Sequence, residues 1–337
     1  KVHASLLEQC VHFFVIRKIV LMISILIPTY NVDCLRLVAD VQKQCEELQA
    51  QYGESEFDYE ILVADDASPV ESIVERNEMI ELLPNCTHLR LTENVGRAAA
   101  RNYLVEQSRM PYILFMDADA EICTDDFILT YWQQREAADV LVGSITNLAE
   151  APSGCELRWR YEVQAEQQRT LTERRRHPAA EFTVFNAFFH RTVFDRVRFD
   201  DARCKDYGYE DALFGLEVEA AGFSILPVDN PLRHLGIHSN EHFLHQTEIA
   251  LRTLARLGAP MTERAKVAKA WSRLRRWRMD GLYRRLFKMI RPVLRRNLLS
   301  QRPILLLFSL YKLGIYCELM GSSMRNTVPS PGADRNT

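Results

Sequence analysis

Two aspartates separated by one small residue, Asp117 and Asp119, follow directly after a short apolar run, Tyr112 to Met116. Aromatic and branched apolar residues in a run of this length are typical of a buried strand. In open α/β sheets, ligands bind at the carboxyl ends of the strands. Two carboxylates there can share one divalent cation, because Mg²⁺ and Mn²⁺ bind one or two protein carboxylates together with substrate phosphates. A solvated loop is the alternative, since Asp-x-Asp is common by chance.

Three more polar clusters follow predicted strands, and each would lie at the same edge of a parallel sheet. They are Thr29-Tyr30, Asp65-Asp66 and Gly96-Arg97. A carboxylate can accept hydrogen bonds from a base or a ribose, Tyr30 can cover a ring, and Arg97 at a helix start can reach a phosphate oxygen. The alternatives are a half-buried Tyr30 in the core and two solvent-facing arginines, Arg97 and Arg101. Taken together, the clusters favour a nucleotide ligand.

An acidic pair, Glu210-Asp211, stands directly before a helix predicted over Ala212 to Ala221. Capping and the helix dipole also favour acidic residues at this position, so the pattern alone is as consistent with a structural role as with a chemical one. Farther along, the segment Pro231 to His245 holds four of the nine histidines. No cysteine partner and no helical His-x-x-x-His glutamate arrangement accompanies them, which argues against a zinc site.

Alternating strands and helices would position these clusters. Strands are predicted over 24–27, 60–64, 88–91, 112–116, 139–145 and 183–191, and helices over 35–51, 72–83 and the segment after Gly96. This order predicts an α/β fold with a largely parallel, Rossmann-like sheet and helices on both faces. The highly charged segment Glu156 to Arg176 is expected to be an exposed helix or a mobile segment that closes over a ligand. Asn186 and Arg191 are either substrate contacts or ordinary strand residues.

The chain has 337 residues and a formal net charge of −3, enough length for one large or two modest domains. Its eight cysteines are scattered without a Cys-x-x-Cys pair, which suits a reducing compartment. A Gly-x-Gly-x-x-Gly loop and a Walker motif are both missing from the sequence, which disfavours dehydrogenases and P-loop enzymes.

Four segments occur in order along the first third of the chain: SILIPTYN, ILVADDAS, NVGRAAARN and FMDADAE. They closely resemble the amino-terminal half of family 2 glycosyltransferases with the GT-A fold, over about Ile23 to Ile122. In that family these segments hold a nucleoside diphosphate sugar. The resemblance implies nucleotide contacts from Thr29, Tyr30 and Asp66, a weaker contact from Asp65, and a place near the diphosphate for Arg97.

The same resemblance implies a divalent metal, Mn²⁺ or Mg²⁺, on the donor diphosphate. Asp117 would address both ribose and metal, and Asp119 would bind the metal most directly. Family members frequently place a histidine beside the diphosphate or metal, downstream of the acidic pair. His234 is the first candidate and His238 the second, since neutral imidazole suits Mn²⁺.

In the family, one carboxylate of the Glu-Asp pair is the catalytic base. Sugar transfer needs such a group because an acceptor hydroxyl is a poor nucleophile until its proton is removed. Asp211 is therefore assigned as the base and Glu210 as the residue that orients the acceptor, with the order between them open. Inversion at the anomeric carbon is implied by the family and not by residue spacing. Many relatives have a tryptophan before the pair where this chain has Tyr207 and Tyr209.

Composition changes after Pro260. Between Arg264 and Arg296 there are thirteen Lys or Arg residues and one acidic residue, Asp280, interleaved with large apolar residues at roughly helical spacing. This pattern is typical of an interfacial helix on anionic lipid. Pro303 to Met320 is largely apolar but is marginal for crossing a bilayer of about 30 Å, and it suits the interface or packing on the protein better. Peripheral attachment to an anionic membrane surface through 264–320 is expected, with a spanning or a solvated helix as alternatives.

The expected organisation has four parts. Residues 1–21 form an N-terminal extension, 22–258 the GT-A domain, 259–325 a basic and apolar helical tail, and 326–337 a disordered end. Within the GT-A domain, 22–122 would bind the nucleotide sugar and 123–258 the acceptor. Arg17 and Lys18 interrupt the apolar residues near the start, so a secretory signal is not expected and the predicted location is the cytoplasmic face of the cell membrane.

The expected function is transfer of a sugar from a nucleoside diphosphate sugar to a hydroxyl of a glycan or lipid-linked acceptor, as in the synthesis of a surface polysaccharide. One alternative is a nucleotidyltransferase, which the missing glycine-rich loop disfavours. Another is a non-catalytic protein that binds a nucleotide sugar within a membrane assembly. Nucleic acid is not an expected partner, because no binding module is recognised and the strongest cluster is acidic.

Overall fold

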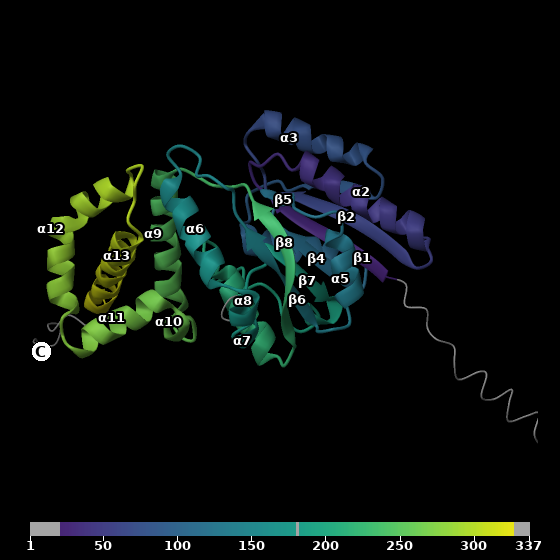
Figure 1. Ribbon diagram of the computed structural model, residues 1–337. Helices are drawn as coiled ribbons and strands as arrows, with labels where there is room; N and C mark the ends of the chain where they lie inside the picture. The colour runs from purple at the N-terminus through teal and green to yellow at the C-terminus, as the bar shows by residue number, and fades with distance from the viewer. Residues whose placement is uncertain (1–20, 180–181, 327–337) are drawn as a thin grey trace, which may run out of the picture.

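The structure is a computed structural model that describes residues 21–179 and 182–326 (Figure 1). Most of the predicted N-terminal extension and of the predicted disordered end lies outside the described residues. The strands are β1 (Leu21–Thr29), β2 (Phe57–Asp65), β3 (Cys86–Arg90), β4 (Tyr112–Met116), β5 (Ala120–Ile122), β6 (Val140–Thr146), β7 (Asn186–His190) and β8 (Ile225–His234). The helices of the sheet region are α2 (Leu35–Tyr52), α3 (Glu71–Glu78), η1 (Met79–Leu82), α4 (Arg97–Gln107), α5 (Phe127–Gln134), α6 (Glu156–Gln168), α7 (Leu171–Arg176), η2 (Arg191–Val193) and α8 (Glu210–Ala220). The remaining helices are α9 (Asn240–Leu257), α10 (Met261–Arg264), α11 (Lys266–Arg276), α12 (Asp280–Leu298) and α13 (Leu305–Asn326).

The strands form one sheet in the order β3-β2-β1-β4-β7-β6-β8-β5. The first four in this order are parallel to one another, as the alternation of strands and helices predicted. Their ends are in register, because Thr29 of β1 pairs with Asp65 of β2. In the other half, β7 runs antiparallel to both β4 and β6, and β5 runs antiparallel to β8. The sheet is therefore mixed, and its four neighbouring parallel strands carry the segments that the sequence predicted to bind a nucleotide.

Apolar residues on both faces of the sheet explain the two layers of helices. In β1, Leu26 belongs to one buried cluster, whereas Ile25 and Ile27 belong to the cluster on the opposite face. Successive side chains of a strand point to opposite faces, so a continuous apolar run needs cover on both sides. Helix α2 packs on one face with Val38 and Val41, both fully buried.

The charged segment 156–176 does not form one exposed or mobile piece. It makes two helices, α6 and α7, and Arg174 at the end of α7 is 7% exposed. The Arg174 guanidinium donates hydrogen bonds to the carbonyl oxygens of Val142 and Gly143 at 2.5 Å each. A guanidinium has five donors, so it can satisfy several carbonyls at the point where the pairing of β6 with β8 shifts register.

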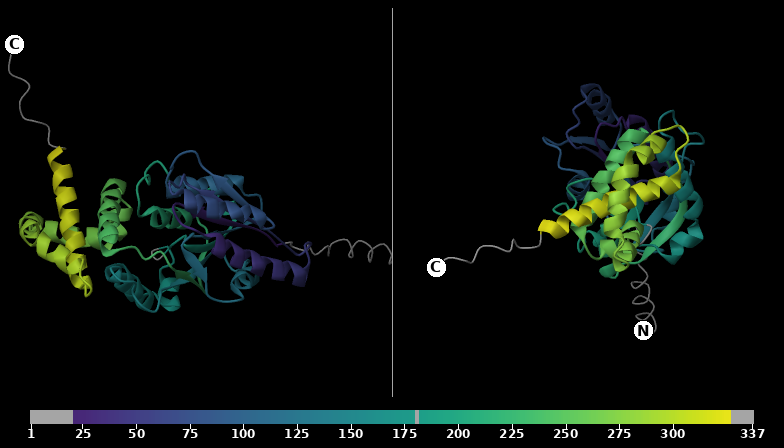
Figure 2. Two further views of the ribbon diagram at one scale, coloured as in Figure 1. Left: turned by 90° about the horizontal axis from the view of Figure 1, so that it is seen from above. Right: turned by 90° about the vertical axis from the view of Figure 1, so that its left-hand side faces the viewer.

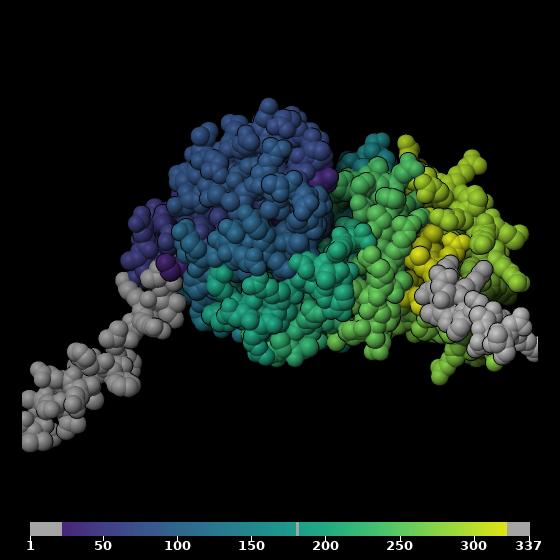
Figure 3. Space-filling view, turned by 180° about the vertical axis from the view of Figure 1, so that it is seen from behind, coloured from purple at the N-terminus to yellow at the C-terminus, as the bar shows by residue number. Residues whose placement is uncertain are grey.

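The C-terminal helices pack at one end of the sheet region. In Figure 1 and in the left view of Figure 2, α13 runs beside α12, and α12 is farthest from the sheet. In Figure 3, α9 lies between the sheet region and these outer helices. The apolar segment predicted over 303–320 forms most of α13, where Tyr311, Tyr316 and Cys317 are buried. Among the described helices, none is both long enough and apolar enough to cross a membrane.

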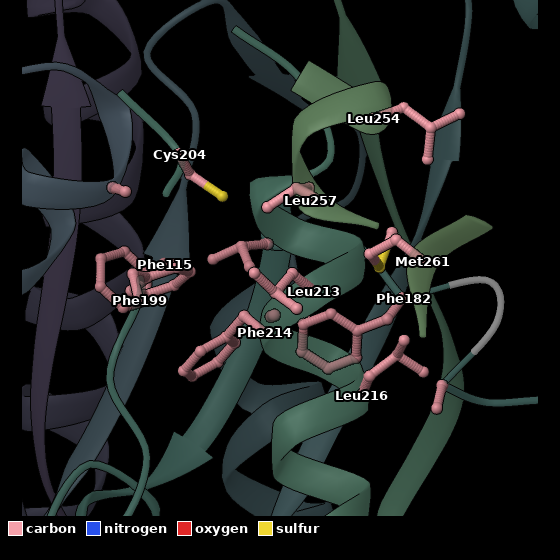
Figure 4. Close-up of a cluster of buried hydrophobic side chains, with 14 of the residues drawn as sticks. Phe115, Phe182, Phe199, Cys204, Leu213, Phe214, Leu216, Leu254, Leu257 and Met261 are labelled. Atoms are coloured by element: carbon pink, nitrogen blue, oxygen red, sulfur yellow. The ribbon is translucent and has the colours of Figure 1, made fainter. Parts of the chain in front are cut away.

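A compact aromatic core fixes α8, the helix that begins with the acidic pair. Phe214 of α8 stacks on Phe199, with ring centroids 4.0 Å apart. Figure 4 shows Leu213 and Leu216 of the same helix among other buried side chains, including Leu257 of α9. Offset aromatic packing of this kind is directional, so it holds the helix at a defined position and rotation. Glu210 and Asp211 are placed by this core.

Candidate active site

One buried arginine joins the two acidic clusters that the sequence singled out. Arg101 Nη2 lies 3.0 Å from Asp117 Oδ1, and Arg101 Nη1 lies 2.8 Å from Asp211 Oδ1. Asp117 directly follows β4, and Asp211 is in the first turn of α8. The structure thus brings the strand-end carboxylate and the helix-start carboxylate to opposite sides of one guanidinium, although 94 residues of sequence separate them (117 to 211).

Arg101 is 1% exposed, so the alternative of a solvent-facing helix arginine is wrong for this residue. Burial works against its charge, but the charges of Asp211 and Asp117 outweigh that effect and raise its pKa. Burying an unpaired guanidinium would cost much free energy, so the two carboxylates stabilise the charge of Arg101 in the interior. The sequence did indicate that both arginines lie on the same side of α4, because Arg97 and Arg101 are four residues apart and therefore share a helix face.

The acidic pair at the start of α8 has two different environments. Asp211 Oδ2 accepts a hydrogen bond from the backbone N–H of Val184 at 2.9 Å, and its side chain is 24% exposed. Glu210 is 9% exposed, and its Oε2 accepts from the backbone N–H of Gly208 at 2.9 Å. Burial, together with the charge of Asp211, raises the pKa of Glu210. Asp211 is therefore the more accessible of the two carboxylates.

The second aspartate of the strand-end motif contacts the predicted histidine. Asp119 Oδ2 lies 3.3 Å from His234 Nε2, because β5 and β8 pair antiparallel with Ala120 opposite His234. The other ring nitrogen, Nδ1, lies 2.8 Å from Glu162 Oε2 of α6. Burial alone would lower the pKa of His234, but hydrogen bonds to these two carboxylates raise it to about 9. Burial alone would raise the pKa of Asp119, but the hydrogen bond and charge of His234 hold it below its usual value.

This donor set fits a divalent cation. Neighbouring ligands of an octahedral cation with bonds of about 2.1 Å lie about 3.0 Å apart, close to the observed Asp119–His234 separation. A metal-binding histidine characteristically gives its other ring nitrogen to a carboxylate, the position that Glu162 occupies. The described residues hold no group of three or more His, Cys, Asp or Glu side chains arranged for a metal, so diphosphate oxygens would have to complete the coordination.

Two residues of this cluster were not anticipated. Glu162 lies in a segment whose charges predicted an exposed or mobile helix. Gly236 lies so close to Asp119 that a Cβ there would stand 1.8 Å from Oδ2. A glycine two residues after a candidate histidine was the available signal for close backbone approach. The second-choice histidine, His238, packs on His242 with ring centroids 4.5 Å apart, and burial lowers its pKa.

The candidate nucleotide residues lie at the ends of β1 and β2. Thr29, Asp65 and Asp66 are buried, whereas Tyr30 is 48% exposed. The Asp65 carboxylate accepts from the backbone N–H of Ser68 at 2.8 Å. The Asp66 carboxylate accepts from the backbone N–H groups of Val95 and Gly96, at 2.7 and 2.9 Å. Asp66 therefore shapes the loop that leads into α4.

The remaining candidates separate into two groups. Arg97 is half-exposed beside the acidic pair, with Nη1 4.0 Å from Glu210 Oε1 and its guanidinium 5.2 Å from the Tyr207 ring. Asn186 is fully buried and donates to the carbonyl of Asn230 at 2.8 Å, while Arg191 donates to the carbonyl of Met110 at 2.5 Å. Asn186 and Arg191 thus have the contacts of structural strand and turn residues.

The curled α/β sheet, flanked by helices and with acidic clusters at its strand ends, is that of a GT-A glycosyltransferase. Residues 24–198, more than half of the chain, match the family described as glycosyl transferase family 2. The chain belongs to glycosyl transferase family 2. The resemblance, the fold class and the enzyme class predicted from the sequence are confirmed.

Relatives of this chain include a bacterial sugar transferase. A 128-residue stretch is 27% identical to the poly(ribitol-phosphate) beta-glucosyltransferase of Bacillus spizizenii and covers 37% of this chain. The match covers 19% of that relative, so the chain spans about a fifth of its length.

Solved structures that are similar to this chain include the following two. The mannosyltransferase PcManGT from Pyrobaculum calidifontis, in complex with GDP-Man and Mn²⁺, is 15% identical with a TM-score of 0.50, and the match covers 91% of this chain and 88% of that one. S. aureus TarS 1-349 in complex with UDP is 16% identical with a TM-score of 0.48, and the match covers 91% of this chain and 92% of that one.

Proposed function

We propose that this chain transfers a sugar from a nucleoside diphosphate sugar to a hydroxyl acceptor, with a divalent metal, Mn²⁺ or Mg²⁺, and with inversion at the anomeric carbon. The observation that carries the proposal is the Arg101 bridge between Asp117 and Asp211. Asp117 is the carboxylate expected near the metal, and Asp211 is the one expected near the acceptor. Because both contact the guanidinium of Arg101, we infer that they belong to one active centre. The complex of PcManGT with GDP-Man and Mn²⁺ supports a donor of this class and a metal.

Asp119 and His234 would hold the metal, with Glu162 orienting the imidazole through Nδ1. When bound, the metal would stabilise the negative charge that develops on the leaving diphosphate. Arg97 is half-exposed on the same side and would add a guanidinium to the diphosphate oxygens. Thr29, Tyr30, Asp65 and Asp66 would form the nucleotide side, with the exposed ring of Tyr30 against the base.

Asp211 would be the general base, because it is the more accessible carboxylate of the pair and has acceptor capacity left on Oδ1. It takes the proton of the acceptor hydroxyl as the hydroxyl oxygen bonds to the anomeric carbon. The bond from that carbon to the diphosphate oxygen breaks, and its electron pair leaves with the nucleoside diphosphate. Attack opposite the leaving group inverts the centre. Glu210, beside it, would orient the acceptor.

The acceptor we propose is a glycan or a lipid-linked glycan, with the enzyme held peripherally at the cytoplasmic face of the membrane. The basic helices of the C-terminal region support this location, and the polymer named for the Bacillus spizizenii relative supports a surface-polysaccharide acceptor.

The test is release of nucleoside diphosphate from a panel of nucleotide sugars, with Mn²⁺ and without an acceptor. Slow release is expected of a transferase because water can replace the acceptor, and it should fall sharply with chelator or with Asp119→Asn. The exposed Asp125 offers a matched control, since Asp125→Asn removes a nearby carboxylate outside the proposed site. Donor binding without any release by the native chain would favour the non-catalytic alternative.

A further inference from the structure

Helix α12 has apolar side chains on two sides, and only one of these sides packs against the rest of the protein. Phe287, Leu294 and Leu298 are buried against the neighbouring helices. A second stripe faces solvent: Leu282, Leu286, Met289 and Val293 are 62%, 48%, 77% and 71% exposed. At 100° per residue, the two stripes are centred about 130° apart around the helix axis. Four large apolar side chains in one exposed row are unusual on a soluble surface.

The segment before α12 extends the exposed stripe. Trp277 is 75% exposed and Met279 is 48% exposed. Five exposed cationic residues accompany the stripe: Arg276, Arg278, Arg285, Lys288 and Arg296. We call these residues together with the exposed stripe the α12 outer face. Asp280 is the one acidic residue between Arg264 and Arg296. Glutamates of other helices pair with Arg264, Arg291 and Arg295, and these three arginines are not part of the outer face.

The α12 outer face lies at an end of the molecule. In Figures 1 and 2, α12 is the helix farthest from the sheet. The apolar segment that the sequence offered as a second membrane contact is packed inside as α13, with Tyr311 fully buried. Contact with a flat surface is therefore available to α12 and not to most of α13.

We propose that the α12 outer face docks on an anionic lipid bilayer. Apolar side chains that enter the acyl boundary and cations that meet phosphate headgroups together match an interfacial helix, and tryptophan suits the same depth. A second copy fits less well, because a symmetric contact would press two cationic faces together. The inference rests on the proposed function in one respect, because a lipid-linked acceptor would require the enzyme to work at the membrane surface.

The test is flotation of the full chain with vesicles of phosphatidylcholine, with and without phosphatidylglycerol. The native chain should float with the anionic vesicles and much less with the neutral ones. Leu286→Gln with Met289→Gln should weaken binding by about tenfold or more, because two apolar anchors are lost. Met79→Gln with Leu82→Gln is the matched control, since both residues are exposed apolar side chains on η1.

A second pair of variants tests the charge. Arg285→Gln with Lys288→Gln should weaken binding to anionic vesicles, as should raised salt. Arg36→Gln with Lys43→Gln removes two exposed cations of α2, with side chains 84% and 74% exposed, and should leave flotation unchanged. Quenching of tryptophan fluorescence by brominated lipid should be largely lost in Trp277→Phe.

Equal flotation of native chain and both α12 variants would overturn the proposal. So would a native dimer, in the absence of lipid, that becomes a monomer in the Leu286→Gln and Met289→Gln variant, because the face would then be an interface between copies. Donor hydrolysis in lipid-free buffer separates this proposal from the enzymatic one. Hydrolysis that persists in variants that no longer float supports lipid docking, and flotation without any hydrolysis would overturn only the enzymatic function.

Discussion

Gly236 lies against Asp119: a Cβ built on the glycine lies 1.8 Å from Asp119 Oδ2 and 3.0 Å from its Cβ. The neighbouring backbone N–H of Leu235 donates to the carbonyl of Asp119 at 2.8 Å, so the loop cannot simply move away. The loop after β8 therefore sets where the Asp119 carboxylate stands and, through it, the separation from His234.

Gly236→Ala should consequently reduce donor hydrolysis and sugar transfer by about 100-fold, because displacement of a reacting group by about 1 Å has effects of this size. The variant should still fold, since the collision is with the Asp119 side chain, which is 22% exposed, and not with backbone atoms. Gly281→Ala is the control, because a Cβ there meets nothing within 4 Å. The measurement is the rate at several Mn²⁺ concentrations. An unchanged rate and Mn²⁺ requirement would show that Asp119 does not need its present position.

Arg101→Lys should destabilise the protein by about 3 kcal/mol, in the range for breaking a buried ion pair. Lysine keeps the charge, but a single ammonium cannot reproduce a planar fork that reaches Asp117 on one side and Asp211 on the other. Chemical denaturation measures the loss, and Arg36→Lys on the exposed face of α2 is the control. Transfer should also fall in conditions where the variant is fully folded. Native-like stability and activity together would mean that the bridge is incidental.

The polar clusters at the strand ends were predictable because each of them follows directly from the local sequence. Each parallel strand is a run of apolar residues that stops at a polar cluster, and parallel strands place such stops at one edge. Thr29 and Asp65 are paired across β1 and β2, as that argument requires. The resemblance to a family then assigned chemistry to these clusters, which spacing alone did not.

The burial of Arg101 and the place of Glu162 were not predictable in the same way. Arg101 meets a carboxylate 110 positions later, and Glu162 meets a histidine 72 positions later, so both depend on tertiary structure. A helix as charged as α6 is typical of a solvated surface, and its pattern contains nothing that marks one glutamate as an orienting group. A buried charge of this kind is recognised only once its partners in space are known.

Glu210→Gln should make the protein more stable at pH 8 while it impairs transfer. Burial and the charge of Asp211 raise the pKa of Glu210, so the folded state holds its proton more tightly than the unfolded state does. The contribution of Glu210 to the stability of the native chain should therefore fall as pH rises from about 4.3, the usual glutamate pKa, through the raised folded value. Glutamine keeps an acceptor for the Gly208 N–H without the charge. Denaturation of both proteins at pH 5 and pH 8 should show a stability difference that grows with pH; a difference that shrinks would contradict the assignment.

Asp211→Asn should lower sugar transfer by about 10² to 10⁴-fold, the usual contribution of a general base, and leave donor binding nearly intact. The asparagine carbonyl can face either Arg101 or the Val184 N–H, but not both, so a loss of about 1 to 2 kcal/mol in stability should accompany the change. The thermal shift produced by a nucleoside diphosphate with Mn²⁺ reports binding independently of turnover. A folded variant that binds the nucleotide and does not transfer supports the base. Failure to fold would instead support a purely structural role at the start of α8. Undiminished transfer would indicate that Glu210 is the base.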